Sequence, residues 1–513
     1  MYSGGDGTIE NPYLIATSAD FFNIRYNLNA HYKQVADINM SDISWEPVGT
    51  FSGSYDGAGH KIYNLDLGSS MALNYGLFGQ IQPTSGRTWV KNITLVNPKV
   101  NQTISGAIKR YFGFLAGQAI NTDFINCNIY QGEIDFTSES ETTEPFEDLG
   151  GICGKTSDCR FENCKVEINL NVYESKDVGF ICGYTYPDAS EEDTVVAKCE
   201  VSGKFKGSFW YAGGIAGRAG GEVSKCSASM IIEGSGTQVG GLIGVSLGHV
   251  YECFSVATLH GKFGESSPLI GRTAGGIVEN CYSHGQINLE ADGLNIYWKA
   301  GGLTGGYSNR FSVADILIRY CYSTCDIMVS GTYVGYAFIG GLAGYNERTR
   351  VTIHGCFALN NNIDTAKEET YIGRILSGQI YTGNTYYNNY ANSIMTYNDG
   401  EFPSPAKTHD GKDGADITLD QAKSPEPYIS VGWDFDDVWT IDPKYNDGLP
   451  YLKWFTPPEP PKPEPEPSKY IKIYDQELKL LAVVINAIEP LITEELNGAY
   501  TFDFSYVIDD EKS

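Results

Sequence analysis

Short stretches of alternating apolar and polar residues recur along most of this chain, and no repeat holds ten residues with helical spacing. Residues 281–287 are typical, because they have the period of two that marks a half-buried β-strand. A five-residue cassette of the form Gly-Gly-apolar-x-Gly precedes such stretches. It is clearest at 213–217, 240–244, 301–305 and 340–344, and related copies lie at 150–154 and 179–183.

The cassettes form an internal repeat that carries a column of cysteines. Counting weaker copies such as the one that ends at Gly271, neighbouring cassettes close at intervals of 27 to 39 residues. The closing glycines of the clearer copies are Gly154, Gly183, Gly217, Gly244, Gly305 and Gly344. Eight of the twelve cysteines follow a cassette, often directly after an asparagine: Cys127, Cys164, Cys199, Cys226, Cys253, Cys281, Cys321 and Cys356.

A repeat of this length is typical of solenoids, propellers and arrays. Each unit holds two or three short strands, which can bury their apolar side only by stacking on the next unit. The sequence therefore predicts an all-β fold, a right-handed parallel β-helix with glycine-cornered rungs, a short N-terminal capping helix and a small C-terminal β segment. We expect the cysteine column to be interior and reduced, and the closing glycines to adopt positive φ or to face the backbone of the adjacent rung.

Both ends of the predicted solenoid, which covers residues 1–455, carry features suited to a cap. Thr17 with Asp20 predicts a helix start, and we expect the helix to run over about residues 18–30. Tryptophans cluster at 431–455, and we expect this segment to plug the far end. The polar stretches 138–148, 186–193 and 292–299 are predicted to be surface loops.

The pattern Gly-Gly-Leu-x-Gly followed by Asn-Cys-Tyr resembles the GLUG-type repeats of bacterial and phage surface β-helices. The resemblance covers about residues 1–455 and implies the fold. It implies less about function, because the same scaffold serves adhesins, enzymes and spikes.

Residues 456–468 contain seven prolines and separate the repeats from a segment of different character. Such a composition predicts an extended polyproline spacer. Residues 469–513, with Ile-Lys-Ile-Tyr-Asp at 471–475, resemble the opening segment of tail-associated hub (prophage endopeptidase tail) proteins of phages. This second resemblance implies other tail or baseplate proteins as partners, a homotrimer formed through the hub segment, and a virion tail location after assembly in the bacterial cytoplasm.

Charge and composition limit the classes of partner that the protein can bind. The 63 acidic and 36 basic residues give a formal net charge of −27, which disfavours nucleic acid and anionic surfaces. No run of apolar residues is long enough to span a bilayer, so we predict no membrane insertion. The cysteines lack zinc-ribbon spacing and no histidine motif is present, so the sequence predicts neither a metal nor another cofactor.

Catalytic signals are weak. Ser246 lies in a Gly-x-Ser-x-Gly match, but that motif acts in a strand-turn-helix context that the repeats do not predict. Carboxylates are too numerous for sequence spacing to identify a catalytic pair. Aromatic residues on predicted loops or rung edges are better candidates for stacking on sugars, and we select Trp210, Tyr211, Tyr297 and Trp298.

Three functions remain open at this point. The first is a phage or prophage tail-tip protein whose β-helix binds host cell-wall polysaccharide or acts as a structural module. The second is a tailspike-like polysaccharide depolymerase, and the third is an adhesin on the bacterial cell surface. Only the first accounts for the last 45 residues.

Overall fold

The computed structural model describes most of residues 2–457 and four strands beyond them. Within 2–457 the description leaves out 69–71, 105–109, 139–145, 186–193, 293–297, 309–314, 333–335, 348–349, 366–369, 378–382 and 404–406. The chain divides into two compact units. The first is Met1–Asp442 with Gly448–Trp454, and the second is Pro443–Asp447 with Phe455–Ser513.

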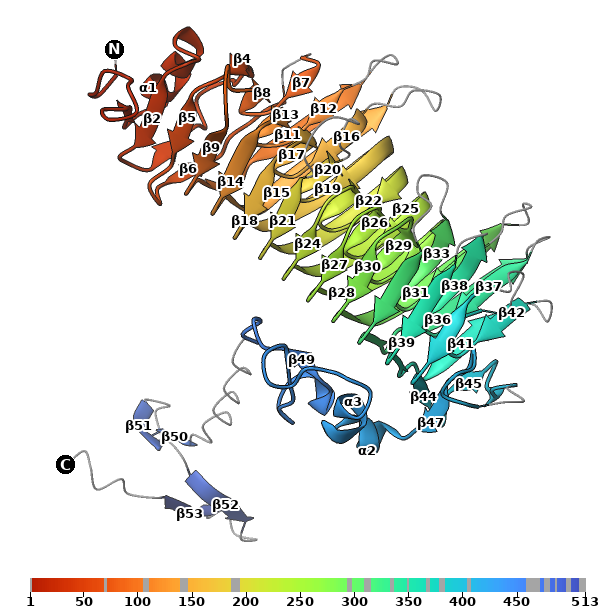
Figure 1. Cartoon of the computed structure of the whole chain (residues 1–513). Coiled ribbons are helices and arrows are strands. Elements are labelled where there is room, and N and C mark those ends of the chain that lie inside the picture. The colour runs from red at the N-terminus through yellow and green to blue at the C-terminus, as the bar shows by residue number, and fades with distance from the viewer. Residues whose placement is uncertain are drawn as a thin grey trace. The chain divides into compact units, whose positions relative to one another are not determined.

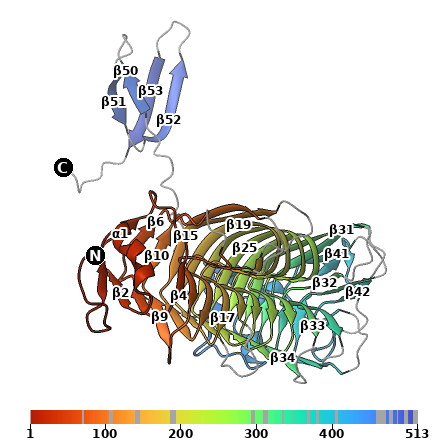
Figure 2. The same cartoon turned by 90° about the horizontal axis from the view of Figure 1, so that it is seen from above.

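The first unit is a parallel β-helix, as the repeat predicted (Figure 1). Each rung contributes strands to three sheets, here named sheets A, B and C in the order in which a rung enters them. The strands of one rung pair in parallel with those of the next. In Figure 2 the long strands of sheet B lie side by side along one wall, and those of sheets A and C complete the coil.

Sheet A contains β1 (Tyr13–Ile15), β2 (His31–Gln34), β5 (Ser54–Asp56), β9 (Thr88–Lys91), β14 (Thr122–Ile125), β18 (Arg160–Glu162), β21 (Val195–Ala197), β24 (Val223–Ser224), β27 (Val250–Tyr251), β30 (Ile277–Glu279), β34 (Ile316–Arg319), β39 (Val351–His354) and β43 (Thr385–Tyr387). Sheet C contains β4 (Val48–Phe51), β8 (Phe78–Ile81), β13 (Ala116–Ile120), β17 (Cys153–Ser157), β20 (Cys182–Thr185), β23 (Ala216–Ala219), β26 (Ile243–Ser246), β29 (Ile270–Thr273), β33 (Thr304–Ser308) and β38 (Ala343–Glu347).

Sheet B contains the longest strands. Its members are β3 (Ile38–Asn39), β6 (Lys61–Tyr63), β7 (Asn74–Tyr75), β10 (Thr94–Val96), β11 (Lys99–Ile104), β12 (Tyr111–Phe112), β15 (Asn128–Ser138), β16 (Phe146–Gly150), β19 (Lys165–Gly179), β22 (Glu200–Ala212), β25 (Ser227–Gly240), β28 (Phe254–Ser267), β31 (Tyr282–Asp292), β32 (Trp298–Gly301), β35 (Tyr322–Ser323), β36 (Asp326–Thr332), β37 (Ala337–Gly340), β40 (Phe357–Ala358), β41 (Asn362–Thr365), β42 (Thr370–Gly373), β44 (Tyr390–Asn392), β45 (Thr396–Tyr397), β46 (Gly400–Glu401) and β47 (Ala415–Ile417).

The corner between sheets A and B explains why asparagine so often precedes the cysteine. Asn126, Asn163 and Asn280 adopt left-handed backbone with φ of 54°, 55° and 53°. Asparagine tolerates this region better than most residues with a side chain. The cysteine that follows turns into the core, and all twelve cysteines are buried and free.

The cysteine column forms a ladder of thiols along the interior. The backbone N–H of Cys199 donates to Sγ of Cys226 at 3.4 Å, and that of Cys226 donates to Sγ of Cys253 at the same distance. Burial raises the pKa of the Cys199 and Cys253 thiols. The side chains therefore act as small apolar residues that also donate weak hydrogen bonds to backbone carbonyls.

The closing glycines of the cassettes do not adopt positive φ. They lie instead where a side chain would strike neighbouring backbone, which was the other expectation. Gly217, Gly244 and Gly305 are absent from the positive-φ residues of the described chain. An added Cβ would lie 2.5 Å from the amide nitrogen of Val178 at Gly217 and 2.8 Å from the amide nitrogen of Ala212 at Gly244. Sheet C thus lies directly against the backbone of sheet B at this point, and only hydrogen fits between them.

The N-terminal cap is shorter than predicted. Helix α1 (Ser18–Phe22) begins with the expected capping box between Thr17 and Asp20, and a 3₁₀ turn, η1 (Asn23–Tyr26), follows it. The helical segment ends before residue 30, because Asn27 leaves helical backbone at φ −141°. Phe21 packs on Trp45 with ring centroids 5.1 Å apart, so the segment covers the first rungs.

The tryptophan-rich segment does not plug the far end, and this expectation was wrong. Residues 418–442 and 448–454, here called the strap, contain α2 (Leu419–Ala422), α3 (Glu426–Ile429), β48 (Trp439–Thr440) and β49 (Tyr451–Leu452). The indole N–H groups of Trp433, Trp439 and Trp454 donate to Gly355, Asn280 and Glu252, respectively. These acceptors lie on successively earlier rungs, so the strap runs back along the side of the solenoid.

A column of aromatic side chains on sheet B explains where the strap lies. Five register-paired residues at the start of successive strands are Phe254, Tyr282, Tyr322, Phe357 and Tyr390. The Tyr282 and Tyr322 rings stack at 5.1 Å, and the Tyr322 hydroxyl donates to the carbonyl of Pro450. The last rungs are instead closed by residues 395–403 and 407–417, from which Met395 and Phe402 reach the core.

Two predicted loops are partly strand. Asp148 belongs to β16 and is buried, whereas 139–145 lie outside the described residues. Trp298 and Lys299 begin β32, because they pair with β37 of the next rung. The predicted loop at 186–193 lies outside the described residues.

The described strands of the second unit form two antiparallel hairpins. They pair β50 (Ile471–Tyr474) with β51 (Leu480–Val484) and β52 (Ala487–Glu494) with β53 (Tyr500–Tyr506). A short 3₁₀ turn, η2, spans Asn446–Gly448. Most of the predicted spacer lies outside the described residues. Among the described residues, no helix has the length and apolar character needed to cross a membrane.

The glycine contacts predict a specific sensitivity to one methyl group. We expect Gly244→Ala to lower the free energy of unfolding by about 1 to 3 kcal/mol, because its Cβ has no room beside the backbone of sheet B. Gly49→Ala is the matched control, since its Cβ would meet only a leucine methyl at 3.5 Å. Thermal melting of both variants tests this, and equal melting temperatures would contradict the close approach.

Candidate functional site

Charged and aromatic side chains gather where strands of sheet B end and strands of sheet C begin, on either side of the cassette. Asp148, Asp177 and Tyr211 are register partners on β16, β19 and β22. Opposite them, Tyr184 and Arg218 are partners on β20 and β23. We call these five residues the seam cluster.

Arg218 holds the cluster together. Its guanidinium donates to both carboxylate oxygens of Asp177, with Nη2 2.6 Å from Oδ2. The same group lies over the rings of Tyr184 and Tyr211, at 4.3 and 4.6 Å from their centroids. A planar guanidinium suits this arrangement because it binds a carboxylate in its plane and aromatic rings on its faces.

Asp148 is the unusual member, because the residue is 2 % exposed and its Oδ1 has no hydrogen-bond partner. Burial, the neighbouring Asp177 carboxylate and nearby Glu147 hold the pKa of Asp148 well above its usual value. Arg218 binds Asp177, and its lowering effect on the pKa of Asp148 is smaller than these raising effects. Burial also raises the pKa of Asp177, although the Arg218 guanidinium opposes that rise. The folded state therefore favours a protonated carboxyl at Asp148.

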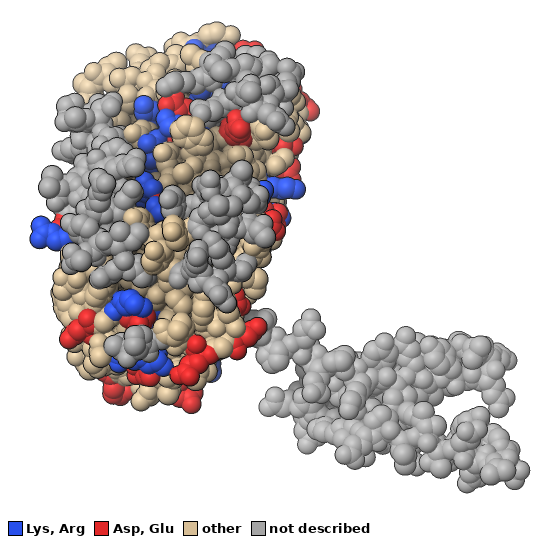
Figure 3. Space-filling model, turned by 90° about the vertical axis from the view of Figure 1, so that its right-hand side faces the viewer, with Lys and Arg blue, Asp and Glu red and all other residues tan. Residues whose placement is uncertain are grey.

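A second buried ion-pair group lies further along the same seam. Glu265 is 3 % exposed and accepts from Arg272 and from Lys299, whose Nζ lies 2.7 Å from Oε1. These two cations lower the pKa of Glu265 despite its burial. In Figure 3 the Lys and Arg side chains form a narrow column down this face of the solenoid.

The seam carboxylates are too deeply buried to act in catalysis. Asp148, Asp177 and Glu265 are each at most 3 % exposed, so a polysaccharide cannot reach them. A general acid or base must approach the reacting atoms within hydrogen-bond distance. Across the described ranges, no group of three or more His, Cys, Asp or Glu residues is arranged to hold a metal ion.

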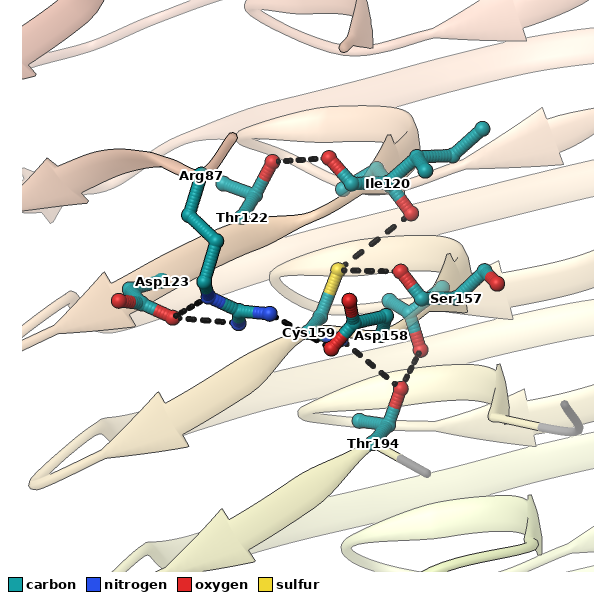
Figure 4. A network of polar contacts seen from close by, with 10 residues as sticks. Arg87, Ile120, Thr122, Asp123, Ser157, Asp158, Cys159 and Thr194 are labelled. Atoms are coloured by element: carbon teal, nitrogen blue, oxygen red, sulfur yellow. Dashed lines mark hydrogen bonds and ion pairs between the residues drawn. The ribbon is translucent and has the colours of Figure 1, made fainter. Parts of the chain in front are cut away.

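A third polar network ties rungs together at the corner of sheets C and A (Figure 4). Arg87 donates from Nη2 to Asp123 at 2.7 Å and from Nη1 to Asp158 at 2.6 Å. Beneath this clamp, the Cys159 thiol donates to the carbonyls of Ala119 and Ser157. Its members come from successive rungs, which indicates a structural role.

The structure separates the four predicted sugar-stacking residues. Trp210 is 48 % exposed on the outer face of β22, as a binding residue requires. Tyr211 packs against Arg218 in the seam cluster. Trp298 is 1 % exposed, so its selection as a loop-borne ligand contact was wrong. Tyr297 lies outside the described residues.

Sequence reasoning missed an acidic hollow near the N-terminal end of sheet B. A groove of about 730 Å³ is lined by residues that include Asp42, Asp66, Lys99, Glu133 and Asp135. Lys99 lies 3.3 Å from Asp66, and the other three carboxylates are on neighbouring segments. Their positions depend on rung stacking, which residue spacing along the chain does not show.

Comparison with known proteins does not assign a family. No protein-family model matches the chain. It is 37 % identical over 108 residues to Halomucin of Haloquadratum walsbyi, which covers 19 % of this chain and 1 % of that protein. It is 33 % identical over 119 residues to a putative Gly-rich membrane protein of Evansella cellulosilytica, covering 21 % of this chain and 13 % of that protein. The chain thus spans a small part of both relatives.

One solved structure aligns over most of the chain. It is a putative immunoglobulin A1 protease from Bacteroides ovatus, with 17 % identity and a TM-score of 0.30 over 89 % of this chain and 96 % of that one. At this level of similarity the comparison carries no functional argument.

The raised pKa of Asp148 predicts how stability depends on pH. The Asp148 carboxyl makes its full contribution to the free energy of unfolding below its unfolded pKa. This contribution is lost as pH rises through the higher folded pKa. Asp148→Asn should therefore be more stable than the unmodified protein at pH 8 and nearly equal to it at pH 4. Each unit between the two pKa values is worth about 1.4 kcal/mol.

Asp177→Asn is the contrasting variant, because it removes the carboxylate that Arg218 binds and should destabilise the protein at pH 8. Thermal melting at both pH values compares the two variants. A lower melting temperature for Asp148→Asn at pH 8 would show that Asp148 is ionised in the folded protein.

Proposed function

We propose that this chain is a non-catalytic module of a phage or prophage tail tip, whose β-helix binds neutral glycan on the host cell surface. The observation that carries the binding role is the exposure of Trp210 on a rigid sheet. Nearly half of this side chain faces solvent on β22, which is paired on both sides with neighbouring rungs. Indole rings offer flat apolar faces to the C–H surfaces of sugars.

The residues beside Trp210 hold it in place. Phe209 is buried in the core, and Tyr211 stacks on Arg218 of the seam cluster. The backbone of Trp210 is therefore fixed on both sides, so binding requires little ordering of the chain. Such preorganisation favours affinity because less conformational entropy is lost on association.

Charge supports a neutral ligand. The net charge of −27 opposes attraction to anionic wall polymers, so affinity for a cell envelope would depend on uncharged sugars. The inaccessible carboxylates of the seam support binding without cleavage.

The tail-tip assignment rests on the resemblance of residues 1–455 to GLUG repeats and of 469–513 to the opening of a tail hub. It implies tail or baseplate proteins as partners and a virion tail location. The alternative is a bacterial surface adhesin, which the partial similarity to a putative membrane protein favours.

A second candidate function is cleavage of the same polysaccharide. The acidic hollow beside Asp66 and Glu133 favours it, because glycosidases place two carboxylates in a groove that admits a sugar chain. This hollow is open to solvent, in contrast to the seam.

Trp210→Ala tests the proposed binding role. We expect the full chain to bind purified host cell walls and the variant to bind about two- to twelvefold less, since an aromatic contact is worth roughly 0.5 to 1.5 kcal/mol. Tyr26→Ala is the control, because Tyr26 is 71 % exposed on the N-terminal cap. Equal binding by both variants would remove Trp210 from the site.

A reducing-end assay on the same walls separates binding from cleavage. We expect no new reducing ends. Their release, and its loss in Glu133→Gln, would instead establish the depolymerase.

A further inference from the structure

Four consecutive strands of sheet B share a groove on their outer face. It has a volume of about 480 Å³ and crosses β15, β19, β22 and β25, so it runs from rung to rung along the solenoid axis. Neighbouring strands lie about 4.8 Å apart, so the first and last of these strands are about 14 Å apart. The groove is therefore elongated in the direction in which the rungs stack.

Glycines leave the groove without side chains along its floor. Gly207 and Gly234 are register partners on β22 and β25, with φ of 137° and 133°. A Cβ would lie 1.7 Å from the carbonyl of Val172 at Gly207 and 1.8 Å from the carbonyl of Gly207 at Gly234. No residue other than glycine fits there, so the hollow is built into the backbone.

A β-bulge supplies an aromatic wall. The register between β19 and β22 shifts between Val172 and Ser175, and Glu174 adopts a φ of 49°. Tyr173, inside this bulge, lines the groove and is 37 % exposed. Bulges often redirect side chains beside functional sites.

The polar groups around the floor are balanced in charge. Lys204 donates to Glu233 at 2.8 Å, and Asn171 donates from Nδ2 to Asp135 at 2.9 Å. Lys206 also lines the groove, and its ammonium group is a hydrogen-bond donor. Together these groups suit a chain of hydroxyl groups better than a strongly charged polymer.

We propose that this groove is a binding subsite for a linear, uncharged glycan that lies parallel to the solenoid axis, with Tyr173 as its stacking residue. The inference rests on the proposed glycan-binding function and identifies where the sugar chain lies. An extended peptide fits less well, because strands β19 and β22 already pair on both sides and offer no free sheet edge.

The test compares two tyrosines with the same exposure. Tyr173 and Tyr130 are each 37 % exposed, but Tyr130 does not line the groove. The probe is the neutral polysaccharide fraction of the host cell wall, together with its partial hydrolysate separated by length. We expect Tyr173→Ala in the full chain to weaken binding about two- to twelvefold and Tyr130→Ala to leave it unchanged.

Fragment length tests the orientation. Affinity should rise with fragment length until the groove is filled, and Tyr173→Ala should reduce that rise. Lys206→Ala provides a second variant on the groove, and melting temperatures confirm that each variant is folded. Equal binding by the Tyr173→Ala and Tyr130→Ala variants would overturn the proposal that the groove binds glycan.

The two proposals fail in different ways. If the unmodified chain does not bind the neutral polysaccharide fraction, both the proposed function and the proposed binding groove are rejected. If the chain binds and Trp210→Ala weakens binding while Tyr173→Ala does not, the function stands and the groove is wrong.

Discussion

In-register parallel pairing is the constraint on which the rest of this structure depends. Apart from bulges such as the one at Glu174, each strand pairs residue for residue with the next rung, so a paired position belongs to a column of neighbours about 4.8 Å apart. Apolar residues, thiols and aromatic rings can stack on their own kind in such a column. Two carboxylates cannot do so without compensation, which explains the proton held by Asp148 and the guanidinium on Asp177.

Changes of residue type within a column mark the boundaries of tertiary features. The cysteine ladder begins after Ile93 and ends at Asn389, whose side-chain oxygen accepts the N–H of Cys356 at 2.9 Å. The first position of these sheet B strands is polar at Lys165, Glu200 and Ser227 and aromatic from Phe254 to Tyr390. The aromatic part is the part that the strap covers.

The sequence was sufficient to predict the β-helix and the interior cysteines, because stacking repeats the same residue types at regular intervals. The sequence did not show why the cassettes need glycine, because glycine is required both where backbones approach closely and where φ is positive. Trp210 and Trp298 looked alike in sequence, yet one faces solvent and the other is buried, because each side chain's direction depends on where its strand begins. The bulge at Glu174 has no local signal of its own. The strap was recognised as buried aromatic sequence, but its position depends on an aromatic column that begins as far back as Phe254.

The strap also determines where a pulling force would enter the solenoid. A solenoid loaded at its last rung would unwind one rung at a time, because each rung contacts only its neighbours. Here the chain leaves the first unit at Trp454. The indole N–H of Trp454 donates a hydrogen bond to the carbonyl of Glu252, in the middle of the solenoid. Tension transmitted through the following residues would therefore act first on the contacts between strap and solenoid, and the terminal rungs would be spared.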